Sequence, residues 1–207
     1  MVTKKGTLLL MTILTMFSAG CHRQQSPGSL LPDTLQLQEG DIVFRRCTGL
    51  TSRIVVAQDR DGIFSHTGIV VDSSGTKMIV HAVPDEPDFP GDPDRVKLES
   101  VASFFSSAHA VAAAVARTAY PEAGTLAAQY AMRRYREGTL FDHDFNDEDT
   151  TRLYCTQLIT LAYEKAGIHL VDTIREVIDL PSFHYRCILP SQIQQSPLLH
   201  YIFMFNP

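Results

Sequence analysis

Apolar and polar residues follow two patterns along this chain, one typical of strands and the other of helices. Short runs rich in β-branched or small apolar residues predict strands at 42–44, 66–71, 77–83, 96–98, 110–116 and 198–205. Apolar residues three or four positions apart, with start and stop signals, predict helices at 51–58, 121–136, 152–167 and 171–179, and shorter helical turns at 99–105 and from Pro190. The pattern predicts one α+β domain with a small antiparallel sheet.

The strongest local signal is a hairpin between residues 66 and 83. Two β-branched runs are joined by Asp72-Ser73-Ser74-Gly75, residue types that favour a tight turn. Antiparallel pairing around this turn brings His66, at the start of one strand, close to His81, near the end of the other. We therefore expect the two imidazole rings to lie within hydrogen-bonding reach. Either histidine taken singly is as often a packed or surface residue as a functional one.

Cys155 lies in the first turn of the predicted helix 152–167. The free backbone N–H groups and the positive end of the helix dipole favour an anion there, so a thiolate is stabilised and becomes a nucleophile. The alternative is a small apolar cysteine that caps a core helix. His143, in the segment Phe141–Phe145 before this helix, is a reserve candidate for a catalytic histidine.

The N-terminus predicts export. Residues 1–20 combine Lys4 and Lys5 with an apolar run and small residues, as a signal peptide does, and residues 21–39 are a polar tether before a domain at 40–207. The small residues before Cys21 resemble the lipobox of bacterial lipoproteins, which implies acylation of Cys21 and a membrane anchor. Secretion without a lipid, or an uncleaved anchor, is the alternative. The absence of Asp after Cys21 resembles outer-membrane sorting, so we expect a cell-envelope protein that faces the periplasm.

Charge and cysteine content narrow the function further. The formal charge is −5, and it becomes −7 once Lys4 and Lys5 are removed, with no basic run. A nucleic-acid partner is therefore not expected. If Cys21 carries lipid, Cys47, Cys155 and Cys187 remain in an oxidising compartment. Either Cys47 and Cys187 form a disulfide and leave Cys155 as a thiol, or all three are buried and reduced.

The segment from Pro84 to Arg95 is rich in proline and acidic residues, so neither a helix nor a strand can run through it. It is either a solvated loop or a border of the substrate cleft, because it follows directly on the strand that carries His81.

Several motifs, in their order along the chain, resemble the circularly permuted NlpC-type papain-like proteins, the YaeF and YiiX group. These motifs are GDIVF at Gly40, FSHTGIVV at Phe64, a polar residue at His81, FDHDF at Phe141 and LYCTQLITLAYEKAG at Leu153. The resemblance implies a permuted papain-like catalytic domain, in which a small antiparallel sheet or half-barrel packs against the nucleophile helix and accessory helices. The histidine precedes the cysteine in this chain, as the permuted group requires.

The resemblance also implies roles for single residues. Cys155 is the expected nucleophile, His66 the general base and His81 the orienting third residue, where some relatives have a carboxylate. Asp41 matches a Gly-Asp pair with a structural role in the turn, and Tyr154 is expected to line the cleft. The backbone N–H of Cys155 is a natural oxyanion donor.

Three functions are compatible with these residues. The leading hypothesis is an envelope cysteine hydrolase or acyltransferase that cleaves an amide or ester of a peptide, a peptidoglycan stem or a lipid through a thioester, with no cofactor. The permuted group also resembles the lecithin:retinol acyltransferase family, which keeps the lipid substrate open. The second hypothesis is a catalytically inactive papain-like binding module, and the third is a metal site of His66, His81 and Cys155.

Overall fold

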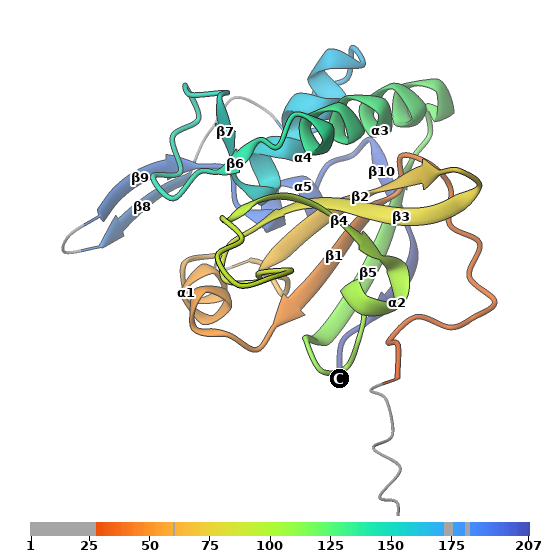
Figure 1. The fold of residues 1–207 in the computed structure, drawn as a ribbon, viewed down its shortest axis with the longest axis horizontal. Coiled ribbons are helices and arrows are strands. Elements are labelled where there is room, and N and C mark those ends of the chain that lie inside the picture. Colours follow the sequence, from red (N-terminus) through yellow and green to blue (C-terminus); the bar gives the residue numbers. More distant parts are fainter. Residues whose placement is uncertain (1–27, 60, 172–175, 181–182) are drawn as a thin grey trace, which may run out of the picture.

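An eight-stranded sheet forms the centre of this computed structural model, which describes residues 28–59, 61–171, 176–180 and 183–207 (Figure 1). The strand order is β10-β5-β1-β2-β3-β4-β6-β7, and all neighbours are antiparallel except β6 and β7. Its strands are β1 (Ile42–Cys47), β2 (His66–Ser73), β3 (Thr76–Val83), β4 (Arg95–Ser100), β5 (Ala110–Thr118), β6 (Leu140–Phe141), β7 (Arg152–Leu153) and β10 (Leu199–Phe205). The sheet curls into a half-barrel, which confirms the predicted α+β, papain-like fold class.

Helices cover one face of this sheet. The long helices α3 (Pro121–Arg136) and α4 (Cys155–Lys165) lie across it, and their small and branched residues pack on strand residues such as Ile69 and Val80 (Figure 1). The short helices are α1 (Leu50–Gln58), α2 (Val101–Phe104) and α5 (Pro190–Gln194). Each large apolar side chain that is buried here stabilises the fold by about 1.5–3 kcal/mol.

A second apolar cluster covers the opposite face. Val43, Val70 and Ile79 alternate with the residues of the first face and pack against Phe104 and Phe105, in and next to α2. Because both faces of the central strands are buried, these strands are apolar along nearly their whole length. The hairpin of His66 and His81 therefore lies in the best-packed part of the sheet.

Most elements form where the apolar pattern predicts them, and helix α3 has the predicted bounds. The terminal segment pairs with β5 as an edge strand, as expected. The predicted helix at 171–179 is wrong: residues Glu176–Leu180 form β8, which pairs with β9 (Phe183–Cys187) in a separate hairpin. Here the backbone pairing with a strand that follows outweighs a weak helical pattern.

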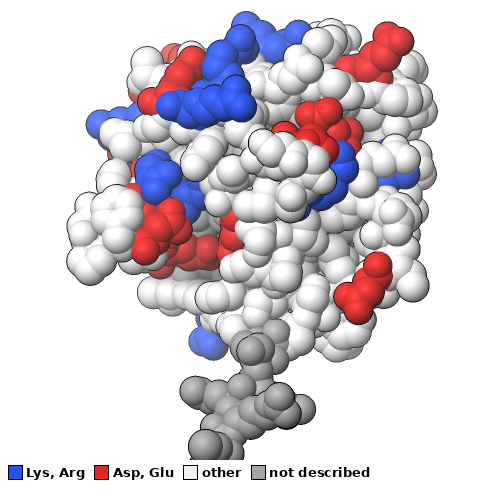
Figure 2. Space-filling view, turned by 45° about the vertical axis from the view of Figure 1, so that its right-hand side comes forward, with Lys and Arg blue, Asp and Glu red and all other residues white. Residues whose placement is uncertain are grey.

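The charged surface is mixed in sign. On the face drawn in Figure 2, acidic and basic side chains lie next to one another among uncharged residues. Within the described ranges, no helix is long and apolar enough to cross a membrane. The predicted signal peptide, Cys21 and the start of the tether lie outside the described residues.

Candidate active site

Cys155 is the first residue of α4. The preceding residue, Tyr154, has an extended backbone (φ −96°, ψ 170°), so the chain turns from β7 into the helix at the cysteine. This helix start is fixed from two sides: Thr156 Oγ donates to the carbonyl oxygen of Ile188 at 2.6 Å, and the Tyr154 hydroxyl donates to Asp147. The cysteine is therefore held at a rigid helix N-terminus, where free N–H groups favour negative charge.

The thiol of Cys155 has two opposing influences on its pKa. Burial of the sulfur raises the pKa to about 11, while hydrogen bonds from the backbone of Thr67 and Thr156 favour the thiolate and lower it. The raised pKa means that the resting cysteine is a thiol at neutral pH, so the thiolate expected from its helix position is wrong for the resting state, because burial outweighs the helix N-terminus. The Thr67 contact places the start of α4 against the backbone of β2, one residue after His66.

The two histidines of the hairpin meet as their positions predict. His66 Nε2 lies 2.9 Å from His81 Nδ1, and both residues are buried. Gly68 in β2 lies beside His81, and a Cβ there would lie 2.8 Å from Ile79 Cγ2 and 3.2 Å from the His81 Cβ. Glycine therefore leaves room for the His81 side chain beside β2.

The surroundings of both imidazole rings favour the neutral form. Burial lowers the pKa of His66 well below its ordinary value, and Arg45 and His81 lower it further. Burial also lowers the pKa of His81, although Glu99 opposes that shift. At pH 7 each ring is thus neutral, so one ring donates the shared hydrogen bond and the other accepts it.

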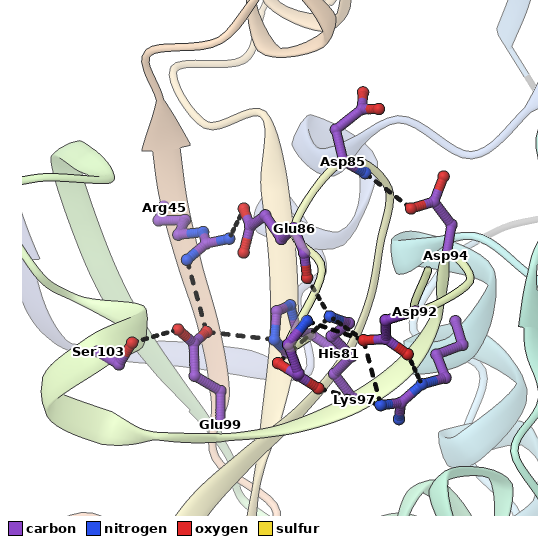
Figure 3. Close-up of polar contacts among 11 residues, drawn as sticks. Arg45, His81, Asp85, Glu86, Asp92, Asp94, Lys97, Glu99 and Ser103 are labelled. Carbon is purple, nitrogen blue, oxygen red and sulfur yellow. Dashed lines mark hydrogen bonds and ion pairs between the residues drawn. The ribbon is translucent and has the colours of Figure 1, made fainter. Parts of the chain in front are cut away.

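Two residues near this pair were missed by the sequence reasoning, namely Arg45 and Glu99. Arg45 in β1 is fully buried, and its guanidinium lies 4.5 Å above the Phe104 ring and 2.5 Å from Glu86 Oε1. Glu99 in β4 lies 3.2 Å from His81 Nε2 (Figure 3). Alternation along the strand from Val43 could have placed Arg45 on a buried face. No strand alternation marks Glu99 in the same way, because the sequence predicts a helical turn at residues 99–105.

Two cavities meet at this site and share Thr51, Val55 and Ser65. The first, of about 410 Å³, is lined by His66 and by polar residues that include Ser65 and Glu86. The second, of about 240 Å³, is mainly apolar. Its lining includes Cys155, Ile54, Val55, Phe145, Tyr154, Ile188 and Leu189. A substrate carbonyl placed near Cys155 would therefore have an apolar space on one side and a polar space on the other.

The proline-rich acidic loop borders the first cavity. Pro84, Asp85 and Glu86 form part of its wall, as the second interpretation of this loop predicts. The loop is fastened to the sheet because Lys97 Nζ donates to the carbonyl oxygen of Glu86 and to Asp92 Oδ2 (Figure 3). Its position next to His66 is thus part of the folded structure.

The remaining predicted residues fall in different places. Asp41 accepts hydrogen bonds from Arg117 at 2.6 and 2.8 Å and from the backbone of Gln38, and it lines neither cavity, which agrees with a structural role. Tyr154 lines the second cavity, and so does the exposed His143, which pairs with Asp94 at 3.1 Å.

The possible Cys47–Cys187 disulfide is not formed in the structure. Cys47 ends β1 and lines the first cavity, whereas Cys187 ends β9 and lines the second. Both residues are thiols in the structure, as in the alternative in which the three cysteines stay reduced. Among the residues that the structure describes, no group of three His, Cys, Asp or Glu side chains is arranged to hold a metal ion.

Comparisons with known proteins agree with this architecture. The family model described as "Permuted papain-like amidase enzyme, YaeF/YiiX, C92 family" matches residues 36–180. The crystal structure described as metalloprotein yiiX from Escherichia coli O157:H7 is similar with a TM-score of 0.65 and 20% identity, over 84% of this chain and 100% of that chain. At this identity the likeness shows a shared fold. No curated protein matches the chain.

Proposed function

Because this chain belongs to the family of permuted papain-like amidases, we propose that it is a cell-envelope cysteine hydrolase that acts through a thioester on Cys155. The observation that carries the proposal is the contact between the Cys155 thiol and the backbone of Thr67, next to His66. It brings the nucleophile on α4 to the strand that begins with His66, and His66 is in turn hydrogen-bonded to His81. This is the arrangement that nucleophilic catalysis requires.

The proposed reaction begins from a neutral thiol and a neutral imidazole. His66 accepts the proton of the Cys155 thiol as the sulfur attacks the carbonyl carbon, and the backbone N–H of Cys155 stabilises the oxyanion. The tetrahedral intermediate collapses, the C–N or C–O bond breaks, and His66 returns the proton to the leaving group. Water then attacks the thioester with His66 again as the base, and the free acid is released. If another acceptor attacks in place of water, the enzyme is an acyltransferase.

The two cavities support a choice of substrate class. The apolar lining of the second cavity, against Cys155, suits a lipid acyl chain or an apolar acyl group better than the polar, charged stem of peptidoglycan. The polar first cavity, against His66, suits the leaving amine or alcohol. We therefore propose an acyl amide or ester with an apolar acyl part, and a peptide or peptidoglycan stem is the alternative to be tested.

The first prediction concerns the nucleophile. Incubation with acyl esters and amides should produce a covalent acyl-enzyme whose mass increase maps to Cys155, and Cys155→Ala should abolish both the adduct and turnover. Intact-protein and peptide mass spectrometry measure the adduct. Lys165→Ala is the matched control, because Lys165 is exposed at the other end of the same helix.

Two outcomes would contradict the proposal. Turnover that persists in Cys155→Ala, with Cys155 alkylated by iodoacetamide no faster than in the denatured chain, would exclude it as the nucleophile. Saturable ligand binding without any acyl-enzyme across peptide, stem-peptide and lipid acyl substrates would instead support the binding module.

A further inference from the structure

Glu99 contacts one nitrogen of the His81 ring, and His66 contacts the other. The Glu99 Oε2 atom is 3.2 Å from His81 Nε2 (Figure 3). The other ring nitrogen, His81 Nδ1, faces His66. Both His81 Nε2 and Glu99 Oε2 are buried, and within the described part of the chain neither makes a hydrogen bond of good geometry, so their polar contacts are the close approach of these two atoms and that of Arg45 Nη1, 3.6 Å from Glu99 Oε2. The other carboxylate oxygen, Oε1, accepts from Ser103 Oγ at 2.5 Å, which fixes the orientation of the carboxylate.

The protonation state of Glu99 determines the direction of these hydrogen bonds. Burial raises the pKa of Glu99, but His81, Ser103 and Arg45 more than offset this, and the pKa falls to about 2. An ionised carboxylate only accepts hydrogen bonds, so the His81 proton must be on Nε2. His81 Nδ1 is then the acceptor, and His66 must donate from Nε2. The lone pair of His66 consequently lies on Nδ1, which is the only nitrogen of that ring left to act as a base.

The charged side chains around His66 and His81 carry a net negative charge, which favours a protonated imidazole. Several charged or titratable groups adjoin the two rings or share a cavity wall with them. They are Arg45 and Cys47 from β1, Glu86 and Asp85 from the loop after β3, Lys97 and Glu99 from β4, and His109 before β5. Lys97 pairs with Asp92. Arg45 pairs closely with Glu86 at 2.5 Å and is 3.6 Å from Glu99. Arg45 is shared between Glu86 and Glu99, so these three side chains together carry one net negative charge, which stabilises a protonated His66 through His81.

The rings are also packed so that they cannot easily turn. Phe104 lies 5.9 Å from the His66 ring and 5.3 Å from the His81 ring, measured between centroids. Both rings are buried, so a flip would break the His66–His81 hydrogen bond without a replacement from water.

We propose that Glu99 is a positioning residue that fixes the tautomers of His81 and His66 and stabilises the His66 imidazolium, which extends the Cys155–His66–His81 triad to a fourth member. This inference rests on the proposed function for its catalytic meaning. The predicted tautomer of each ring can be tested whether or not the protein turns over a substrate.

The first arm of the test is nitrogen-15 NMR of the histidine-labelled wild-type protein at pH 7. We expect both His66 and His81 to carry their proton on Nε2. A proton on Nδ1 of His81 would overturn the proposal outright, whatever the variants do.

The second arm is the pH dependence of Cys155 alkylation by iodoacetamide, compared between wild type, Glu99→Gln and Glu137→Gln. Glu137 is the matched control, because it also pairs with an arginine, Arg134, but lies on the surface after α3. In Glu99→Gln we expect alkylation at pH 7 to be about tenfold slower and its midpoint to move up by about one pH unit, as for loss of a nearby unit charge in a partly buried site. Glu137→Gln should match the wild type.

Ser103→Ala distinguishes charge from structure. It removes the hydrogen bond to Oε1 but leaves the carboxylate charged, so its alkylation midpoint should remain close to wild type. An unchanged midpoint in folded Glu99→Gln would overturn the proposal even if total activity fell. If wild-type Cys155 is no more reactive than a denatured thiol, the proposed function fails instead, while the tautomer result still decides the role of Glu99.

Discussion

At the scale of single residues, the buried polar side chains of the site each form a hydrogen bond or ion pair with a neighbour. His66 and His81 share one hydrogen bond, Arg45 pairs with Glu86, and Glu99 is held by Ser103. A buried polar atom that loses such a partner costs about 1–3 kcal/mol, more if it is charged. The same contacts that arrange the rings for catalysis therefore also contribute to the stability of the sheet.

The buried histidines should make the protein less stable in mild acid. Both have a lowered pKa, so the folded chain binds fewer protons than the unfolded chain below pH 6.5. Their contribution to the free energy of unfolding is complete above pH 6.5 and is lost as the pH falls towards their folded pKa values. Between pH 6.5 and 5.5 the free energy of unfolding should therefore fall, and His66, whose pKa is lowered further, should contribute more than His81.

Thermal unfolding between pH 7.5 and 5.5 measures this effect. Glu99 stays ionised throughout this range, since its pKa of about 2 and its unfolded value of 4.5 lie below it. The double variant His66→Gln with His81→Gln should have a flatter dependence of Tm on pH, whereas His200→Gln, which changes an exposed histidine, should retain the wild-type slope. An unchanged slope in the double variant would contradict the prediction.

At the scale of elements, the position of α3 over the sheet depends on two glycines. Gly40, just before β1, has φ +89°, and a Cβ at this position would lie 2.3 Å from the Cα of Gly124 in α3. The Tyr163 hydroxyl of α4 also donates to the Gly40 carbonyl oxygen. Both helices thus pack against the same backbone turn, and a side chain there would push α3 away.

Gly40→Ala should destabilise the fold more than its backbone conformation alone explains. Gly75 is a matched control, with φ +85° and no atom within 4 Å of a Cβ. Gly75→Ala should cost about 1–2 kcal/mol for the left-handed backbone, and Gly40→Ala about 1–3 kcal/mol more, from overpacking. Urea denaturation gives both free energies of unfolding. An equal decrease in the free energy of unfolding in the two variants would show that α3 can shift to accommodate the new methyl group, and would contradict the prediction.

At the scale of the whole molecule, we propose that the domain is tethered to the envelope membrane through a lipid on Cys21. The motif around Cys21 supports this proposal. The predicted tether at 21–39 is too long, because Leu30 donates from its backbone to Phe105 and Leu31 is buried in the second apolar cluster, so the linking segment ends before Ser29. One lipidated terminus anchors a protein without crossing the bilayer. An apolar acyl substrate would then be present at the same surface as the second cavity.

The anchor predicts a change in cell fractionation. In a bacterial host, wild-type protein should sediment with outer membranes and incorporate a fatty-acid probe, whereas Cys21→Ser should do neither. Cys47→Ser is the control, because it also removes a thiol but lies within the folded domain. Membrane association of Cys21→Ser equal to wild type would favour an uncleaved anchor, and release of the wild type would favour simple secretion.

The sequence by itself determined the features that depend on neighbours along the chain. The turn at Asp72–Gly75 and the β-branched runs beside it define the hairpin, and so the meeting of His66 with His81. The apolar spacing of α4 and its start at Cys155 are local as well. Even the edge strand β10 could be recognised from its apolar run, because strand propensity is a property of a short segment.

Only the tertiary structure decided which of these segments lie together. Cys155 reaches the backbone of Thr67 because α4 packs on β2, a contact between residues far apart in the chain. Arg45 and Glu99 join the histidines because β1 and β4 are the neighbours of β2 and β3, respectively. The pairing of β8 with β9 likewise replaced a predicted helix. Long-range packing and the desolvation of charges depend on the whole fold, and no local pattern of residues contains them.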